Sequence, residues 1–477
     1  MRKKSIPFVL FVLALGSLAC GGKLGIKDAR IAPSEDWMGI YINNAKIGYV
    51  YSRQEIKGNS YRFTQKSTMR FELLGSDETF ATTLEAVTDK DLNLEEFTFD
   101  ISSRQHTFYA EGKREGEVIK VKIETAGRVE TKEIQAKYAL ISPALAPWVT
   151  TRSPKPGDKL TVTVFEPTLL KTLPVSIKVI APETLLLDGV RVPTLKMEMR
   201  MMGLCSEVWL DSTGASVKEI QQPGIVMVRE PREKALEAVS GAAKLDLLSF
   251  FAVRSDSAIA GPRGLKELKL RVEGLTRRED LIVSSTTQKA KWIEEGVELT
   301  ITRPDTVKIG RSSIPQKSPR EFLGSSFYIQ AEDPQIKRTA SRIVGDETDA
   351  MSAAAKLVNW VYANLRKRAT ASVPSAVEVL ETREGDCNEH AILLAALGRA
   401  AGIPTKINVG LVYLDGAFYY HAWNSFWIGE TWVPADATYG QLPADPTHVQ
   451  LHEGELGEQA RVLSVVGEIE IDVISYR

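Results

Sequence analysis

Residues 385–397 read Gly385-Asp386-Cys387-Asn388-Glu389-His390-Ala391-Ile392-Leu393-Leu394-Ala395-Ala396-Leu397. This pattern predicts a helix, because Asp386 is a favourable N-cap residue and Glu389, three positions later, completes an aspartate version of the capping box. Gly402 and Pro404 give a normal helix stop. The body of the helix is apolar nearly all round, so we expect it to lie in a core.

Cys387 occupies the first position of this predicted helix. The unpaired N–H groups and the positive end of the helix dipole favour a thiolate there, which predicts a reactive nucleophile. The alternative for this segment alone is an ordinary buried cysteine.

Three strand-like segments follow the helix. The first hairpin turn is predicted at Asp415-Gly416 and the second at Gly429-Glu430. The segments comprise residues 406–413, 418–428 and 431 to about 438.

The second turn sets a register that brings two polar residues together. If Ile428 faces Thr431, His421 faces Thr438, and Asp436 is the diagonal neighbour of His421 on the same face of the sheet. A carboxylate at that position can hold an imidazole in one tautomer, as in a triad of nucleophile, base and orienting residue. A bulge at Pro434 would shift this register.

Three separated blocks are similar to the core of the transglutaminase-like superfamily, whose fold is related to papain-like cysteine proteases. The resemblance implies that Cys387 is the nucleophile, His421 the base and Asp436 the orienting residue. Ala437 departs from the proline that bacterial members commonly have after the aspartate. The blocks are Gly385 to Ala391 with Gly402-Ile403-Pro404, then Tyr420-His421-Ala422-Trp423, then Trp432-Val433-Pro434-Ala435-Asp436-Ala437-Thr438.

No metal or cofactor is expected. His390 lies three residues after Cys387, but no partner pair has the spacing of a metal site. His448 and His452 are placed beyond the core. The second oxyanion donor is not identified.

The chain begins with a predicted export signal over residues 1–20. Arg2, Lys3 and Lys4 precede an apolar run from Ile6 to Ala19, which is too short to span a bilayer. The end of this run is similar to the cleavage box of a bacterial lipoprotein, which implies lipidation of Cys20 and a periplasm-facing protein, with Gly21 favouring the outer membrane. A plain secretory signal, giving a secreted or periplasmic protein, is the alternative.

The expected fold class is α+β, with antiparallel β-rich domains before a C-terminal transglutaminase-like domain. A length of 477 residues favours two or three domains. Strand and turn patterns predict a large β domain, and an Ala- and Glu-rich stretch indicates a helical linker. The predicted divisions are a tether at 21–35, the β domain at 36–232, the linker at 233–264, a small β module at 265–318 and the catalytic domain at 327–477, with its core at 342–440. Residues 467–475 are expected to add a final strand to the catalytic domain.

Charge and cysteine content limit the functions available. The chain has 60 basic and 61 acidic side chains, so no global field favours nucleic acid, and no nucleic-acid partner is expected. After Cys20, only Cys205 and Cys387 remain. A disulfide between them is disfavoured, because Cys205 lies in a Met-rich strand pattern and is interpreted as a small buried hydrophobe.

The resulting hypothesis is an envelope-anchored cysteine acyl-transfer enzyme of the peptidase, amidase or transglutaminase type. It would act on a protein or peptide through a thioester, and Cys20 would attach it to the membrane. An arylamine acetyltransferase-like use of the triad ranks third. The opposing hypothesis is a noncatalytic envelope lipoprotein whose core is a binding scaffold for an envelope protein.

Overall fold

The computed structural model describes residues 31–73, 76–103, 107–125, 128–237, 252–275, 281–368, 375–455, 462, 465 and 468–477. Cys20 and the predicted signal and lipidation site lie outside these residues. Among the helices described, none has the length and apolar character needed to cross a bilayer. The chain divides into two compact units, one within residues 11–247 and the other within 248–477.

The first unit is one fifteen-stranded sheet made of two meanders. Strands β1 to β8 pair in succession, β10 to β15 do the same, and β15 closes the connection by pairing antiparallel with β1. The first meander contains β1 (Ser34–Ile42), β2 (Ala45–Lys57), β3 (Ser60–Leu73), β4 (Ser76–Thr88), β5 (Leu94–Ser102), β6 (Thr107–Glu115), β7 (Val118–Thr125) and β8 (Arg128–Gln135). The second contains β10 (Lys159–Glu166), β11 (Lys171–Leu187), β12 (Val190–Met201), β13 (Leu204–Asp211), β14 (Ser216–Gln221) and β15 (Ile225–Arg229).

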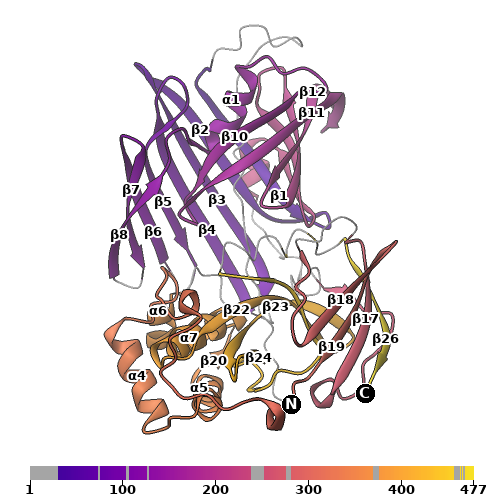
Figure 1. The fold of residues 1–477 in the computed structure, drawn as a ribbon. Coiled ribbons are helices and arrows are strands. Elements are labelled where there is room, and N and C mark those ends of the chain that lie inside the picture. Colours follow the sequence, from indigo (N-terminus) through magenta and orange to yellow (C-terminus); the bar gives the residue numbers. More distant parts are fainter. Residues whose placement is uncertain are drawn as a thin grey trace. The chain divides into compact units, whose positions relative to one another are not determined.

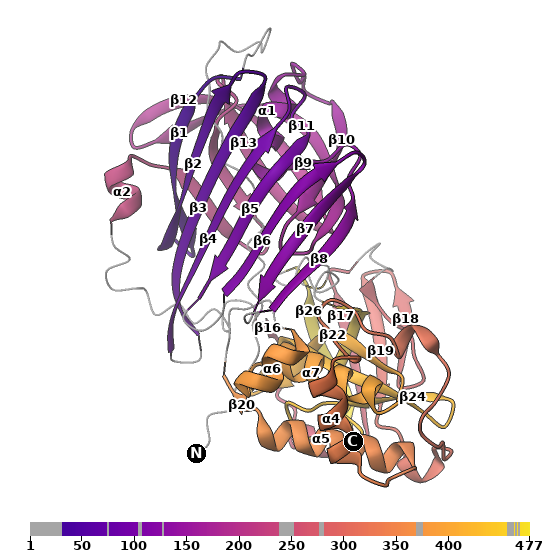
Figure 2. The same ribbon diagram turned by 90° about the vertical axis from the view of Figure 1, so that its left-hand side faces the viewer.

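The two meanders share a core because the sheet curves back on itself (Figures 1 and 2). The rings of Phe97 on β5 and Phe165 on β10 lie 4.9 Å apart. Between the meanders lie β9 (Leu140–Ile141), the short helix η1 (Ser142–Ala144) and α1 (Leu145–Thr150). Several strands bury alternate residues, as in β5 and in β7, where Ile119, Val121 and Ile123 are buried. The predicted antiparallel β architecture is therefore confirmed.

The second unit contains a five-stranded sheet packed against helices. The sheet has the order β16-β23-β22-β25, with β24 pairing with β23. Its strands are β16 (Val253–Arg254), β22 (Thr405–Leu414), β23 (Ala417–Ile428), β24 (Thr431–Ala435) and β25 (His448–Glu453). The helices are α4 (Pro334–Val344), α5 (Ala350–Asn364), α6 (Ala376–Thr382) and α7 (Cys387–Ala400), with the two-stranded β20 (Arg366–Lys367) and β21 (Glu384–Gly385) between them.

A four-stranded sheet completes this unit, in the order β18-β19-β17-β26. It consists of β17 (Glu267–Glu273), β18 (Gln288–Ile293), β19 (Gly296–Thr302) and the C-terminal β26 (Glu470–Tyr476). The same unit contains the short helices η2 (Pro262–Gly264), η4 (Thr306–Lys308) and η5 (Arg320–Phe322). The final strand therefore joins the predicted small β module rather than the catalytic sheet.

The predicted linker at 233–264 also differs from the structure. The helix there, α2 (Arg232–Leu236), is short, and residues 238–251 lie outside the described part of the chain. Val253 of β16 then pairs with Phe418 at the edge of the five-stranded sheet. Residues 248 onward thus form one compact unit instead of a linker, a separate module and a catalytic domain. Pairing between strands that are distant in the chain determines this domain boundary. Local sequence patterns do not show which strands will pair.

Candidate active site

Helix α7 begins at Cys387, where the sequence placed it. Asp386 Oδ1 accepts a hydrogen bond from the backbone N–H of Asn388 at 2.9 Å, and Glu389 Oε2 accepts one from the N–H of Asp386 at 2.8 Å. The reciprocal capping box is therefore confirmed. The residues of α7 from Cys387 to Gly398 are buried, as the apolar pattern predicted.

The environment of the Cys387 sulfur differs from the expected one. Sγ accepts a hydrogen bond from the backbone N–H of Ala422 on β23 at 3.1 Å, and the side chain is fully buried. Burial raises the pKa of the Cys387 thiol well above its usual range, and the negative charge of Asp386 raises it further. This direction is opposite to the thiolate that the helix start favours, and burial is the largest cause of it.

The predicted β23–β24 register holds along the whole of β24. Ile428 pairs with Thr431 and Asn424 with Ala435, and Pro434 introduces no bulge. The ladder then ends, so Thr438 does not pair opposite His421. Asp436 instead opens a turn that is closed by two backbone hydrogen bonds with Gln441, at 2.9 and 2.8 Å.

This turn still brings Asp436 to His421. His421 Nε2 lies 2.9 Å from Asp436 Oδ2, and both side chains are fully buried. Because the ionised carboxylate is an acceptor, Nε2–H is the donor, and Nδ1 carries the lone pair. Within the described part of the chain, no hydrogen-bond partner reaches Nδ1. Cys387 Sγ accepts its hydrogen bond from the backbone of the residue that follows His421, and the Asp436 carboxylate is near enough to raise the pKa of the thiol.

Burial and neighbouring groups shift the pKa values of both His421 and Asp436. Burial lowers the pKa of His421, although the Asp436 carboxylate acts against this. For Asp436, burial alone raises the pKa, but the charges and hydrogen bonds of His421 and His448 hold it well below its usual range. Asp436 Oδ1 also accepts the backbone N–H of Thr438 at 2.6 Å. Asp436 is thus an ionised and fixed carboxylate.

Sequence reasoning missed His448, which it placed beyond the core. His448 Nε2 lies 2.9 Å from the same Asp436 Oδ2 that His421 contacts. The residue begins β25, which pairs with β22 beside β23. Alternation of Val449 and Leu451 was the local signal for this strand, but its partner is about forty residues away in the chain and could not be deduced from spacing.

His421, Asp436 and His448 offer ligand atoms within 4.8 Å of one another, a grouping that a metal ion could use. Both imidazoles, however, already direct Nε2 at one carboxylate oxygen, at 2.9 Å each. A protonated ring nitrogen is not a metal ligand. Hydrogen bonding accounts for the cluster without an ion.

His390 has a structural role in α7. Its Nδ1 donates to the backbone carbonyl of Asp386 at 2.6 Å, and the ring is fully buried. Burial lowers the pKa of His390 to about 4, so the ring is neutral. It therefore supports the turn that carries Cys387.

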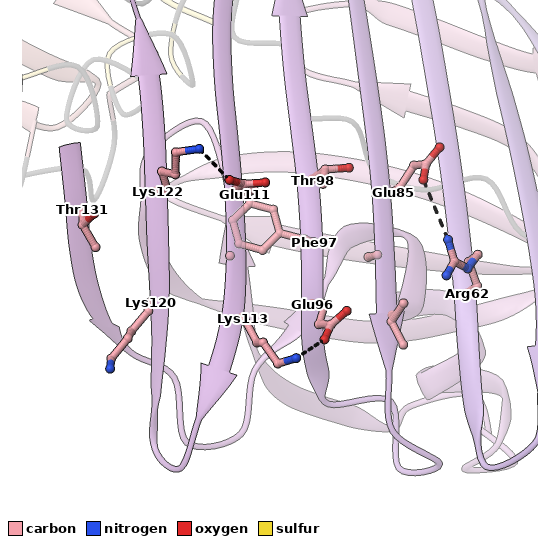
Figure 3. A pocket seen from close by; sticks show the side chains of 13 residues that line it. Arg62, Glu85, Glu96, Phe97, Thr98, Glu111, Lys113, Lys120, Lys122 and Thr131 are labelled. Carbon is pink, nitrogen blue, oxygen red and sulfur yellow. Dashed lines mark hydrogen bonds and ion pairs between the residues drawn. The ribbon is translucent and has the colours of Figure 1, made fainter. Parts of the chain in front are cut away.

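The β domain offers a different kind of site, an open hollow of about 420 Å³ on strands β3 to β8. Figure 3 shows that six of its charged side chains form three pairs between strands, and Lys120 pairs with Glu115 outside the hollow. The pairs are Lys113–Glu96 at 2.7 Å, Lys122–Glu111 at 3.0 Å and Arg62–Glu85 at 3.9 Å. Because these charges neutralise one another and are exposed, the hollow does not concentrate a charge for a ligand.

Comparison with known proteins agrees with this geometry. Residues 337–437 match the family model described as the transglutaminase-like superfamily. The chain carries a transglutaminase-like core. The match lies close to the predicted core at 342–440 and contains Cys387, His421 and Asp436. No curated protein matches the sequence.

Solved structures similar to this chain have low identity. A proposed cysteine protease from Cytophaga hutchinsonii is 17% identical, with 45% of this chain and 86% of that chain covered and a TM-score of 0.28. A beta-barrel-like protein with a domain of unknown function from Brucella abortus is 10% identical, over 42% and 96%, with a TM-score of 0.34. A proposed protease from Parabacteroides distasonis is 11% identical, over 72% and 69%, with a TM-score of 0.21. These similarities add nothing to the argument from the transglutaminase-like core.

Proposed function

We propose that the protein is a cysteine acyl-transfer enzyme in which Cys387, His421 and Asp436 act as nucleophile, base and orienting residue. The observation that carries this proposal is the state of His421. Its Nε2 is fixed on Asp436, while Nδ1 has no partner among the described residues and is available as a base. His390 also leaves one ring nitrogen without a partner among these residues, so what distinguishes His421 is its bond to the Asp436 carboxylate and its place next to Ala422, whose N–H contacts Cys387 Sγ.

The reaction begins from a neutral thiol and a neutral imidazole. The Cys387 Sγ–H proton moves to His421 Nδ1 as sulfur attacks the carbonyl carbon of an amide. The C–N bond then breaks, the amine leaves with the proton from Nδ1, and a thioester remains on Cys387. Water or a second amine gives a proton to Nδ1 as it attacks the thioester carbon, the C–S bond breaks, and the Cys387 sulfur takes that proton from Nδ1. The acyl group leaves as a carboxylic acid or as a new amide. Asp436 stabilises the imidazolium that forms in each step.

The substrate and location follow from the same proposal. An amide in a protein or peptide supplies the acyl group, and a second amine in place of water would make the reaction a transamidation. Lipidation of Cys20 would attach the enzyme to the cell envelope facing the periplasm, at the outer membrane, where envelope proteins are available as substrates or partners. A secreted or periplasmic form remains the alternative.

One observation favours the competing function, a noncatalytic binding scaffold in the cell envelope. The Cys387 side chain is fully buried, so a substrate reaches the sulfur only if neighbouring groups move. A scaffold would need no such movement.

Labelling with iodoacetamide at pH 7 separates the two functions. Exposure alone predicts that Cys205, which is partly exposed, reacts before the buried Cys387. We expect the reverse order, measured by peptide mass spectrometry, because His421 takes the thiol proton. His421→Ala should slow labelling of Cys387 by about 100-fold and leave Cys205 unchanged.

Labelling of Cys387 only after unfolding, in both the parent protein and His421→Ala, would contradict the enzyme and support the scaffold. A positive result leads to the next step, which is to incubate the protein with candidate peptides and detect an acyl thioester on Cys387 by mass. Cys387→Ser is the matched control, since it keeps the size of the side chain.

A further inference from the structure

The hydrogen bonds of His448 require both of its ring nitrogens to be protonated. Nε2 lies 2.9 Å from Asp436 Oδ2, and Nδ1 lies 3.0 Å from the backbone carbonyl oxygen of Asp445. A carbonyl oxygen and an ionised carboxylate can only accept. His448 must therefore donate through both nitrogens, which makes it an imidazolium.

The groups around His448 are arranged to keep that positive charge. Asp445 Oδ1 lies 3.6 Å from Nδ1, and Asp445 is in turn held by Arg263, whose Nη1 lies 3.0 Å from Asp445 Oδ2. Arg263, Asp445, His448 and Asp436 thus alternate in sign and sum to zero. Burial alone lowers the pKa of His448, but Asp445 and Asp436 raise it to about 9.

The other groups near His448 do not disturb this balance. The ring of His421 on β23 lies 5.5 Å away between centroids, and the rings of Trp423 and Tyr439 lie 5.2 and 6.3 Å away. Lys406 on β22 lines the same small cavity as His448, and it is paired with Glu453. Asp436, Asp445, Arg263, His421, Lys406 and Tyr439 are the charged or titratable groups that the described residues place around His448, and burial raises the pKa of Tyr439 so that its hydroxyl stays neutral.

We propose that His448 is a positioning residue that holds Asp436 through the same carboxylate oxygen that His421 contacts and sets the basicity of His421. Its positive charge neutralises the Asp436 carboxylate that would otherwise draw a proton onto His421. The resting site therefore keeps a neutral imidazole with a lone pair on Nδ1. The effect of His448 on catalysis rests on the proposed function. The protonation states proposed for His448 and His421 do not depend on the protein being an enzyme.

The protonation pattern can be measured by NMR of the full chain labelled with ¹⁵N and ¹³C in its histidine rings. The chain has five histidines, so single substitutions assign each signal. At pH 7 we expect both nitrogens of His448 to be protonated and His421 to carry its proton on Nε2 alone. In His448→Gln, the pKa of His421 should rise by about one unit, because a nearby cation has been removed.

Two further variants keep the test decisive if His448→Gln unfolds. Asp445→Asn preserves the shape of the side chain, removes one negative charge beside His448 and should lower the pKa of His448. His452→Gln, on the same strand, is the control and should leave the titration of His421 unchanged. A purely structural role for His448 would alter stability without moving the pKa of His421.

A singly protonated His448 at pH 7, or a His421 titration that is the same in parent and His448→Gln, would overturn the proposal. Iodoacetamide labelling of the same samples distinguishes this failure from failure of the proposed function. Rapid labelling of Cys387 with a neutral His448 would leave the enzyme standing and remove the positioning role. Slow labelling of Cys387 with a doubly protonated His448 would contradict the proposed enzyme and leave the protonation pattern of His448 in place.

Discussion

At the scale of single residues, the site is decided by what each polar atom can donate or accept. Asp436 Oδ2 receives two imidazole donors, His421 and His448, and Oδ1 receives backbone N–H groups. A buried carboxylate is stable only when its lone pairs are used in this way. The same accounting leaves Nδ1 of His421 without a partner among the described residues, which is the atom that the proposed mechanism uses as the base.

The charge on His448 predicts how stability changes with pH. Its pKa is about 9 in the folded protein against 6.5 for an ordinary histidine. Its contribution is therefore fully present below pH 6.5 and is lost as the pH rises through 9. The shift corresponds to at most about 3 kcal/mol. Urea unfolding of parent and His448→Gln across pH 6 to 10 should show stabilities that converge as the pH rises, and a constant difference would contradict this.

At the scale of elements, the placement of β25 against β22 carries His448 to the site. Gly410 on β22 pairs with His421 on one side and with Gln450 on the other. A Cβ at Gly410 would lie 2.0 Å from the backbone oxygen of Val449. Only a residue without a side chain allows β25 to approach so closely.

Gly410→Ala is therefore expected to displace β25 and His448. We expect a loss of about 1 to 3 kcal/mol in the free energy of unfolding and a shift of the His448 ring signals in the histidine NMR spectrum. Gly324→Ala is the matched control, since no atom lies within 4 Å of the added Cβ. Equal stability of the two variants would show that the strands can separate without cost.

At the scale of the whole molecule, the transglutaminase-like core depends on residues that come well before its family match. Gln288 Nε2 donates to the carbonyl of Gln450 at 2.7 Å, and the N–H of Gln450 donates to Gln288 Oε1 at 2.9 Å. Arg263 holds Asp445 in the same region. The terminal strand β26 pairs with β17 in the four-stranded sheet.

These contacts predict the boundary of an independently folding fragment. Residues 248–477 should unfold cooperatively in urea, because all strands of both their sheets are present. Residues 320–477 should not, because β16 to β19 are missing and β26 loses its partner. Near-ultraviolet circular dichroism of the two fragments checks this, and a native-like spectrum for 320–477 would contradict it.

Sequence determined the features that depend on neighbours in the chain. The capping box fixed the start of α7 at Cys387, and the turn at Gly429-Glu430 fixed the β23–β24 register as far as Ala435, the residue before Asp436. The alternation of buried residues gave the antiparallel sheet of the first unit. Each of these follows from hydrogen bonding or side-chain direction over a few residues, which is why the three candidate residues could be selected from local patterns.

Tertiary structure alone decided the rest. His448 joins the site through strand pairing across a long loop, β26 joins a sheet built from residues near 270, and the thiol of Cys387 is kept protonated by burial that no local pattern measures. The physical reason is common to all three. Strand pairing and loss of hydration both depend on which distant segments pack together. The local sequence around each residue does not specify those segments.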